Sequence, residues 1–446
     1  KYRSMNDDER NRAARAKYLS LESPVDRFAS SSPASSTTSS SRSTTRTLTT
    51  TKTTTSSSKS SNSVIDLLKG HPNDAHLPSA AMSRILLRMS KELSKELSSP
   101  STCLNYGDEA GNKSFLSHLA SYIGPDCDVK NLFVTNGISH GLDMLTAVLR
   151  PSDPSSSFVV FVEKPSYFLA SSIFRNHGAT VLPAPMLPTG GVDASALALA
   201  LSSPSLSAST TLLYTIPTNH NPTGFTYDLE QRRHLARTCA AHGCYLVADE
   251  VYHFLDWSAS GPPPRLYAAS GKDPFVVSVG SFTKVFSPGV RCGWVEADEA
   301  LVARLVSRGF IQSMGGAAPF TGEVMRVALE TGEVNVHLEG LKREYKTRST
   351  AMAAMLRTCP KITIPFVPTG GYFMWLKISG VKPSFVGDLR AKHGLVVMDG
   401  SAAGMDVGEE DGVYVRLCFA CLDTQDMYEG IARLVRAVNE GTSSSS

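Results

Sequence analysis

The sequence has 446 residues, more than one hydrophobic core usually organises, so we expect two folded lobes after an unusual N-terminus. The formal net charge of +3 is uneven: residues 1–63 carry 11 Lys and Arg against 5 Asp and Glu, and the remainder carries 33 against 36. Without a basic surface, the folded part is not expected to bind nucleic acid. No apolar run approaches the ~18 residues that a membrane span requires, so we expect a soluble protein without a membrane segment.

Residues 28–63 consist mainly of Ser and Thr and offer almost nothing to bury, so residues 1–63 are predicted to be a disordered tail. The charged residues of this tract are Arg42, Arg46, Lys52 and Lys59. A tract rich in Ser, Thr and Arg also fits an organelle transit peptide, whereas the acidic residues at positions 7–9 do not. We expect a cytoplasmic protein and keep organelle targeting as the alternative.

Short apolar runs alternate with helical patterns in the first folded region. Strands are predicted at residues 132–135, 158–162, 212–216, 245–248 and 275–279. Between two of them, residues 228–242 place Leu229, Leu235 and Cys239 on one helical face, and Gly243 is a plausible helix stop. Buried strands separated by helices are typical of a mostly parallel sheet with helices on both faces, where ligands bind beyond the carboxyl ends of the strands.

A second folded region begins near Val334, where Leu338, Leu341, Tyr345 and Met352 are spaced as on a long amphipathic helix. Strand-like segments follow at residues 371–378 and 412–419, which predicts a smaller α/β domain. The expected division is a disordered tail at 1–63, an N-terminal segment joining the small domain at 64–105, a large domain at 106–333, the small domain at 334–438 and a disordered tail at 439–446.

Eight cysteines at irregular positions do not form a disulfide framework, and they favour a reducing compartment. Cys418 and Cys421 form one C-x-x-C pair. A zinc site needs a second pair of ligands, and this pair lies in an apolar run. We expect the pair to pack in the core and no metal to bind.

Two short motifs suggest other chemistries when they are taken singly. Residues 137–141 match the G-x-S-x-G nucleophile elbow of α/β-hydrolases, with Ser139 as the nucleophile, and follow a predicted strand. Residues 281–284 match the S-x-x-K motif of penicillin-binding proteins, but the S-D-N and K-T-G companions are absent from the sequence. Both patterns are short enough to recur by chance, so a serine hydrolase using Ser139 is kept only as a remote alternative.

A longer set of motifs is much more specific. The set consists of N-P-T-G at 221–224, D-E-V-Y at 249–252, S-F-T-K at 281–284 with Arg291, N-Y-G-D at 105–108, G-G-Y-F at 370–373 and R-L-C-F-A at 416–420. From about residue 64 to residue 438, the chain resembles the class I/II aminotransferases of fold type I. The resemblance implies a large, mostly parallel seven-stranded sheet domain with helices on both faces, plus a smaller α/β domain.

The resemblance also implies the cofactor pyridoxal 5′-phosphate, an electron sink for the electron pair left when the substrate Cα loses a proton. Lys284 is expected to hold the cofactor as a Schiff base and then to move that proton, tasks suited to a buried lysine with a lowered pKa. Asp249 is expected to keep the pyridine nitrogen protonated. Asn221 and Tyr252 are expected to donate hydrogen bonds to the 3′ oxygen of the ring.

The cofactor phosphate needs N–H groups, hydroxyls and a cation, best placed at a helix N-terminus. By resemblance these come from the backbone N–H of Ile138, from Ser139 and Ser281, and from Arg291. Tyr106 is expected to reach the phosphate of the other subunit. A homodimer with shared active sites is therefore implied.

Three further residues complete the site that the resemblance implies. Tyr167 is expected to stack on the pyridine ring. Arg416 is expected to bind the substrate α-carboxylate through its planar, bidentate guanidinium. The backbone of Gly70 and the side chain of Asn221 are also expected to contact the substrate.

The resemblance is narrower in two segments. D-L-L-K-G-H-P at 66–72 and S-M-G-G-A-A-P-F at 313–320 are similar to the 2-aminoadipate/aromatic aminotransferase branch. That branch also contains bacterial regulators with an N-terminal winged helix, but the Ser/Thr tract carries no helix-turn-helix pattern, so a DNA-binding regulator is not expected.

The expected activity is a ping-pong transfer of an amino group from an α-amino acid (2-aminoadipate, aromatic or aliphatic) to a 2-oxo acid such as 2-oxoglutarate. A cysteine-conjugate β-lyase or an aminocyclopropane-carboxylate-synthase-like lyase remains the alternative, since these enzymes use nearly the same residues with the same cofactor.

Overall fold

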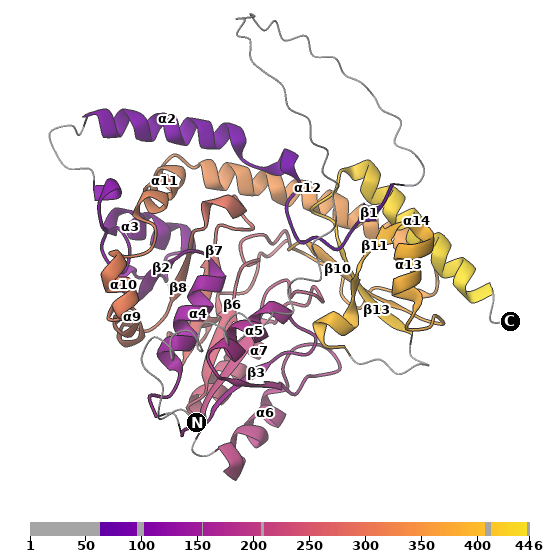
Figure 1. Ribbon diagram of the computed structural model, residues 1–446, viewed down its shortest axis with the longest axis horizontal. Coiled ribbons are helices and arrows are strands. Elements are labelled where there is room, and N and C mark those ends of the chain that lie inside the picture. The colour runs from indigo at the N-terminus through magenta and orange to yellow at the C-terminus, as the bar shows by residue number, and fades with distance from the viewer. Residues whose placement is uncertain (1–62, 96–101, 154, 207–208, 406–411, 444–446) are drawn as a thin grey trace, which may run out of the picture. The chain divides into compact units, whose positions relative to one another are not determined.

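The computed structural model describes residues 63–95, 102–153, 155–206, 209–405 and 412–443, all of which fall in one compact unit (Figure 1). The predicted tail at 1–62 and any targeting signal or DNA-binding element in it lie outside the described residues. The expected boundary between a large and a small domain near residue 333 stays a prediction. Within the described part, each helix is too short or too polar to cross a membrane.

The largest sheet has seven strands in the order β2-β8-β7-β6-β5-β3-β4. The strands are β2 (Leu132–Thr135), β3 (Phe158–Val162), β4 (Thr180–Pro183), β5 (Thr210–Thr215), β6 (Tyr245–Asp249), β7 (Val276–Ser281) and β8 (Gly293–Glu296). All pairs are parallel except those of β8, which runs antiparallel to β2 and β7. The mostly parallel seven-stranded sheet of the predicted fold class is confirmed.

Two of these strands were not predicted. β4 lies at the sheet edge and its residues are exposed or half-buried, so it lacks the apolar run of a buried strand. β8 is fully buried but reads Gly-Trp-Val-Glu, a mixed pattern that gives no period. Its glutamate, Glu296, is balanced by a buried ion pair with Arg265 at 2.8 Å.

Helices pack on both faces of this sheet, as predicted. One face is covered by α4 (Ile138–Leu149), α5 (Phe168–Asn176) and α9 (Glu299–Val306), and the other by α6 (Ala194–Leu201), α7 (Leu229–Ala241) and α8 (Leu266–Ala269). Alternate residues of β3 divide between the two cores: Val160 packs with the first group of helices, and Val159 and Phe161 pack with the second.

The α7 helix begins and ends where the sequence predicts. Asp228 accepts a hydrogen bond from the backbone N–H of Gln231 and forms a reciprocal capping box with it. Gly243 follows the helix in the left-handed conformation, with φ +62°.

A second sheet of four antiparallel strands has the order β12-β13-β10-β9, and β1 pairs with β11 in parallel. The strands are β1 (Ile65–Asp66), β9 (Ile362–Thr363), β10 (Phe373–Ile378), β11 (Leu395–Val396), β12 (Met398–Asp399) and β13 (Val413–Cys418). The strand-like segments predicted at 371–378 and 412–419 correspond to β10 and β13. Cys418 is buried, and Cys421 packs half-buried against the same core.

The remaining helices are α2 (Ser79–Lys95), α3 (Lys113–Ile123), α10 (Gly309–Met314), α11 (Pro319–Glu330), α12 (Glu333–Leu356), α13 (Phe385–His393) and α14 (Thr424–Ser443). Short 3-10 turns lie at Asp74–His76, Thr102–Leu104, Val129–Asn131, Pro204–Leu206, Pro288–Val290 and Gly400–Ala403. The long helix predicted from Val334 is α12. The α14 helix continues past Val438, where we expected folded structure to end. The prediction stopped too early because the last residues of the helix are polar and show no apolar pattern.

Candidate active site

The residues predicted for catalysis follow three neighbouring strands. β5, β6 and β7 are adjacent and parallel, so their carboxyl ends meet at one edge of the sheet. β6 ends at Asp249, β7 ends at Ser281 with Lys284 shortly after it, and the loop after β5 carries Asn221. The fold thus brings together residues that lie far apart in the sequence.

Asp249 is a buried carboxylate whose hydrogen-bond donors are uncharged. The hydroxyl of Tyr214 donates to its Oδ2 at 2.7 Å, and the backbone N–H of Val251 donates to its Oδ1 at 3.2 Å. Burial raises the pKa of Asp249 to about 6, although these two hydrogen bonds and the charge of Lys284 act to lower it. Such a carboxylate is well suited to bind a protonated ring nitrogen, because a positive charge nearby would favour its ionised form.

Lys284 extends toward the N-terminal segment of the chain. Its Nζ donates to the carbonyl oxygen of Gly70 at 2.7 Å and lies 5.0 Å from the ring centroid of Tyr372. Burial lowers the pKa of Lys284 to about 8, and the positive charges of Arg416 and Arg291 act in the same direction. A large fraction of the amine is therefore uncharged at mildly alkaline pH, as attack on an aldehyde requires.

Arg416 lies on β13 and is 6% exposed. Its Nη1 donates to Oδ1 of Asn221 at 2.9 Å, its Nη2 donates to the carbonyl oxygen of Leu68 at 2.8 Å, and its guanidinium carbon lies 3.8 Å from the ring centroid of Phe373. The buried Nε has no hydrogen-bond partner among the described residues. Burial lowers the pKa of Arg416.

Asp249, Lys284 and Arg416 share one property. In the described ranges of the chain, none of the three has an oppositely charged side chain within 4.0 Å. Leaving a charge buried and unpaired costs several kcal/mol, so sites of this kind are completed by a ligand or shift their protonation. The three groups fit pyridoxal phosphate and an amino acid: a carboxylate that accepts from a ring nitrogen, an amine that attacks an aldehyde and a guanidinium that donates to an α-carboxylate.

Tyr252 and Tyr167 lie close to the same carboxylate. Tyr252 is 2% exposed, and its ring packs against Tyr372 and Phe373 at centroid distances of 5.6 and 6.2 Å. Tyr167 precedes α5 and is half-buried. Burial raises the pKa of Tyr167, and the negative charge of Asp249 adds to this.

The α4 helix begins at Ile138, directly after β2, and Ser139 lies in its first turn. Its N-cap residue, Gly137, has φ 86° and provides no side-chain acceptor for the free N–H groups of the first turn. A Cβ added at Gly137 would lie 2.7 Å from Nη2 of Arg291, so the close approach of the guanidinium also requires glycine there.

Arg291 brings a positive charge to this helix end. Its Nη2 donates to the carbonyl oxygen of Asn136 at 3.1 Å, and it forms no ion pair with any described residue. The backbone of Arg291 is left-handed, with φ 47°, a conformation that costs a non-glycine residue about 1 kcal/mol or more. Ser281 lies nearby, with its hydroxyl 2.7 Å from that of Thr283, which in turn is 3.5 Å from Arg291 Nη1. Three segments of the chain thus bring together the residues that were predicted to bind the phosphate, and phosphate binding itself stays a prediction.

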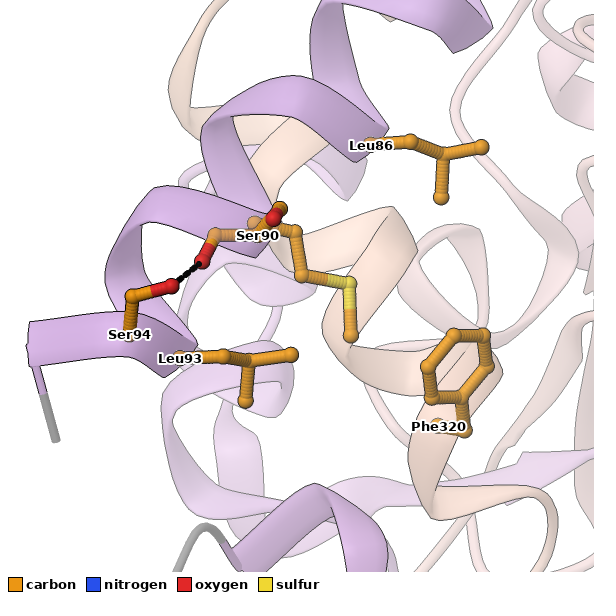
Figure 2. Close-up of a pocket in the computed structure, with 6 residues that line it drawn as sticks. Leu86, Ser90, Leu93, Ser94 and Phe320 are labelled. Atoms are coloured by element: carbon orange, nitrogen blue, oxygen red, sulfur yellow. Dashed lines mark hydrogen bonds between the residues drawn. The ribbon is translucent and has the colours of Figure 1, made fainter. Parts of the chain in front are cut away.

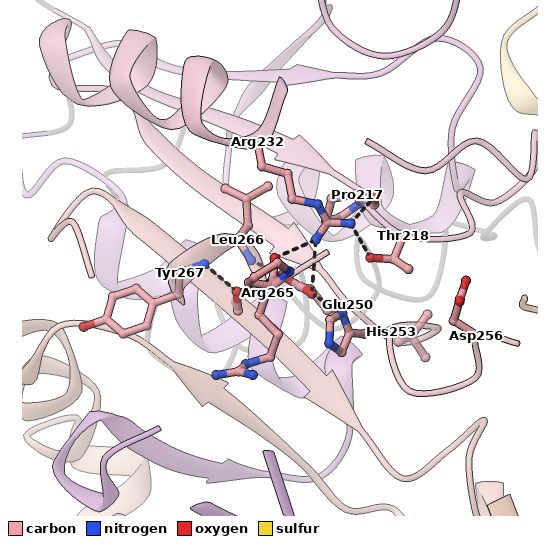
Figure 3. A network of polar contacts seen from close by, with 12 residues as sticks. Pro217, Thr218, Arg232, Glu250, His253, Asp256, Arg265, Leu266 and Tyr267 are labelled. Carbon is pink, nitrogen blue, oxygen red and sulfur yellow. Dashed lines mark hydrogen bonds and ion pairs between the residues drawn. The ribbon is translucent and has the colours of Figure 1, made fainter. Parts of the chain in front are cut away.

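A buried polar network lies beside Asp249 and supports the loops that follow β5 and β6 (Figure 3). Arg232 of α7 donates through Nη2 to the carbonyl oxygen of Pro217 at 2.8 Å and to Oγ1 of Thr218 at 2.7 Å. Its Nη1 is 4.0 Å from Oε2 of Glu250, which is 3.2 Å from Nδ1 of His253. Burial acts to raise the pKa of Glu250, but His253 and Arg232 outweigh it and lower the pKa to about 2.

Glu163, at the end of β3, supports the loop after β5 from the other side. Its Oε1 accepts hydrogen bonds from the hydroxyls of Thr215 at 2.9 Å and Tyr227 at 2.6 Å, and its Oε2 accepts from the backbone N–H of Ile216 at 2.9 Å. His220 Nε2 lies 3.1 Å from the same Oε2. The loop is therefore held on both sides by buried ionic groups, which fixes the position of Asn221.

Gly70 and Tyr106 differ in their distance from the other predicted site residues: Gly70 contacts Lys284, and in the described part of the chain Tyr106 does not contact any of them. The carbonyl oxygen of Gly70 accepts the hydrogen bond from Lys284, and a Cβ added at Gly70 would lie 2.7 Å from the ring of Phe373, so Gly70 packs closely against both side chains. Tyr106 is 76% exposed and makes no contact with another predicted site residue that the structure records. Within one chain, the structure does not bring Tyr106 to the others.

An apolar groove lies elsewhere, between α2 and α11. It is lined by Leu86, Met89, Ser90, Leu93, Ser94 and Phe320. Figure 2 shows Leu86 and Leu93 of α2 extending toward the helix that carries Phe320. None of the lining residues was predicted to touch the cofactor or substrate.

Several known proteins are similar to this chain over most of its length. The family model for aminotransferase class I and II matches residues 63–434. The 2-aminoadipate transaminase of Thermus thermophilus is 28% identical over 342 residues, which cover 75% of this chain and 81% of that protein. An uncharacterized HTH-type transcriptional regulator of Bacillus subtilis is 24% identical over 385 residues, covering 85% of this chain and 75% of that protein.

A solved structure shares the fold. The α-aminoadipate aminotransferase of Thermus thermophilus, crystallised in complex with N-(5′-phosphopyridoxyl)-L-leucine, superposes with a TM-score of 0.70 at 25% identity. The match covers 85% of this chain and 93% of that chain.

Proposed function

We propose that this chain, which belongs to the aminotransferase class I and II family, moves an amino group from an α-amino acid to a 2-oxo acid with pyridoxal 5′-phosphate attached to Lys284. The observation that carries the proposal is a set of three buried charged side chains that lack oppositely charged partners among the described residues: Lys284 and Asp249 after adjacent strands of the large sheet, and Arg416 of β13, which contacts Asn221. Their charges and donors are complementary to the cofactor and to an amino acid.

The bound cofactor supplies an electron sink for the electron pair left at the substrate Cα after deprotonation. Asp249 would provide the negative charge that a protonated ring nitrogen requires, and Asn221 and Tyr252 would donate hydrogen bonds to the ring oxygen. The N-terminus of α4 with Ile138 and Ser139, together with Ser281 and Arg291, binds the phosphate. Tyr167 stacks on the ring.

The chain's own residues also carry the proton and hold the substrate. The Nζ of Lys284, once it no longer holds the cofactor, would accept the proton of Cα and deliver it to the C4′ position of the cofactor. Arg416 would bind the α-carboxylate through its buried Nε, which has no hydrogen-bond partner among the described residues, and through the second N–H of an Nη nitrogen, since Nη1 and Nη2 each use one N–H on Asn221 and Leu68.

For the substrates, we propose 2-aminoadipate, aromatic or aliphatic amino acids as donors and 2-oxoglutarate as an acceptor. The support is the 2-aminoadipate transaminase of Thermus thermophilus among the relatives and the leucine adduct in the solved α-aminoadipate aminotransferase. Measuring turnover of these amino acids against 2-oxoglutarate tests the assignment, which would be wrong if another class, such as acidic four-carbon donors, were preferred.

An assay without any 2-oxo acid distinguishes a transaminase from a lyase. A transaminase that receives only an amino acid converts one equivalent per active site and then stops, because its cofactor keeps the amino group. We expect that single turnover, followed by renewed reaction when 2-oxoglutarate is added. Continuous release of ammonia and a 2-oxo acid without an acceptor would instead establish a lyase.

We also propose that two copies of the chain form a homodimer in which Tyr106 binds the phosphate in the partner's site. Exposed apolar residues support this: Leu86 and Leu87 of α2, Leu104, and Phe320 of α11 are each more than 40% exposed. Removing such apolar surfaces from water is the usual source of stability in an obligate dimer.

Mixed dimers test the shared site. Tyr106→Phe removes one hydrogen bond to a charged group, so we expect cofactor affinity about tenfold lower in the homodimeric variant. A mixed dimer of one Tyr106→Phe chain and one Lys284→Ala chain contains one complete site, because the intact Lys284 receives Tyr106 from its partner. About half of the wild-type activity per dimer is expected. If the mixed dimer were no more active than a Tyr106→Phe site, Tyr106 would act within its own chain.

A further inference from the structure

Tyr214 is a buried residue of β5 that was not predicted to belong to the site. It is paired with Val247 of β6, and Asp249 lies two residues further on, on the same face of that strand. The phenol spans this distance and donates to Oδ2 of Asp249 at 2.7 Å. No surface of Tyr214 is exposed, and its ring packs edge-on against Phe174 of α5 at a centroid distance of 5.5 Å. The hydroxyl is thus held on this one acceptor.

From this geometry we infer that Tyr214 is a positioning residue, which keeps the Asp249 carboxylate ionised and turned toward the cofactor's ring nitrogen. The inference rests on the proposed function, because it assigns Asp249 to that nitrogen. Oδ2 is engaged by Tyr214, and Oδ1 accepts only the weaker 3.2 Å contact from Val251. A carboxylate has about four acceptor positions, so both oxygens retain capacity for a ring N–H.

The surroundings of Asp249 explain why such a donor is needed. The charged and titratable groups that act on this carboxylate from the packed elements are Tyr214 of β5, Glu250 beside it, Lys284 after β7, Tyr167 at α5 and Tyr252 in the following turn. Burial and the negative charge of Glu250 raise the pKa of Asp249, while the hydrogen bond from Tyr214 is the largest effect that lowers it. Removing the hydroxyl should therefore shift the pKa of Asp249 further upward.

The variant Tyr214→Phe removes the hydroxyl and keeps the ring in its packing. The protein is stripped of cofactor, and its affinity for pyridoxal phosphate is measured against pH. The affinity of the wild type should fall as the pH drops through about 6, where Asp249 becomes protonated. In Tyr214→Phe we expect this fall at a pH about one unit higher, which makes binding about fivefold weaker near pH 6 and nearly unchanged near pH 9.

A cofactor analogue isolates the interaction. In the carbocyclic analogue of pyridoxal phosphate, a C–H group replaces the ring nitrogen, so Asp249 has nothing to bind. Tyr214→Phe should then match the wild type within about twofold. In addition, Asp249→Asn and the double variant Asp249→Asn/Tyr214→Phe should bind pyridoxal phosphate equally, since Tyr214 acts only through Asp249. Tyr267→Phe is the control, because Tyr267 is equally buried but packs on the opposite face of the sheet.

The possible results separate the inference from the function on which it rests. Equal weakening of both ligands by Tyr214→Phe would show that the hydroxyl does not act through the ring nitrogen, and an unshifted pH profile would show that it does not act on Asp249. Either result would overturn the inference. If the wild type itself bound the analogue as tightly as pyridoxal phosphate at every pH, the assignment of Asp249 would fail, and the inference with it. A wild type that bound neither compound would contradict the proposed function.

Discussion

Replacing Lys284 with alanine is expected to lower the rate of amino-group transfer by about 10⁴-fold or more. The variant loses both the amine that holds the cofactor and the group that moves the Cα proton, and positioned proton transfer alone contributes about 10²–10⁴-fold. Stopped-flow measurement of the half-reaction with an amino acid checks this. Binding of the phosphate and ring should persist, because Arg291, Ser281 and Asp249 are untouched.

The environment of Lys284 adds a pH dependence. Because burial lowers its pKa to about 8, the uncharged amine that attacks the cofactor aldehyde becomes the main form as the pH rises above about 8. The rate of covalent attachment to the stripped protein should therefore rise with pH through this range and then level off. A rate that rose only near pH 10.5 would mean that the amine is solvated and unshifted.

The control for Lys284→Ala is Lys346→Ala, which removes an exposed lysine from α12. It should leave both the half-reaction and the pH profile unchanged. A Lys284→Ala protein that kept more than a few per cent of the wild-type rate would require another base and another attachment point, and the proposed site would be wrong.

The second large effect is expected at Arg416. The variant Arg416→Ala should lower kcat/KM for the amino acid by about 100-fold or more, since losing one partner of a buried charge pair costs about 2–5 kcal/mol. The 2-oxo acid carries the same carboxylate, so its kcat/KM should fall by a similar factor. Steady-state kinetics with both substrates varied measures the two losses separately.

Two further variants give this prediction its controls. Arg416→Lys keeps the charge but loses the planar fork, so we expect a loss that is smaller than that of alanine but still clear. Arg390→Ala removes an exposed arginine from α13 and should have no effect. If Arg416→Ala raised the KM of neither substrate, Arg416 would serve only to hold Asn221, and another cation would have to bind the carboxylate.

The sequence was most informative where a role depends on position along the chain. Asp249, Ser281 and Lys284 stand at or just after buried strands, and adjacent parallel strands necessarily bring such residues to one edge. The capping residues of α7 could be identified for the same reason, because Asp228 and Gly243 act on their own helix.

Residues whose roles depend on other strands were missed. Tyr214 lies within an apolar strand and resembles any core aromatic until β6 is placed beside it. The role of Arg232 could have been found from the sequence, because Arg232 lies at helical spacing between Leu229 and Leu235, on the face predicted to be buried. An arginine on a buried face needs several hydrogen-bond acceptors. The role of Glu163 could also have been found, because Glu163 is a charged residue directly after a buried strand.

The contact of Gly70 with Lys284 shows the same limit. The glycine matched its motif weakly in the sequence, because its importance comes from a backbone carbonyl and from the nearby ring of Phe373, which local patterns do not reveal. Tyr106 is the opposite case. Its motif is clear, but its partner belongs to a second copy of the chain, so neither the sequence nor a single chain can place its hydroxyl.

The most direct test of the central claim is to treat the cofactor-bound protein with borohydride and to map the modified peptide by mass spectrometry. Reduction makes the link between cofactor and amine permanent. We expect one phosphopyridoxyl group per chain, attached to Lys284, and none in the Lys284→Ala protein. A group on another lysine, or a reducible link that persists at this site in Lys284→Ala, would contradict the account.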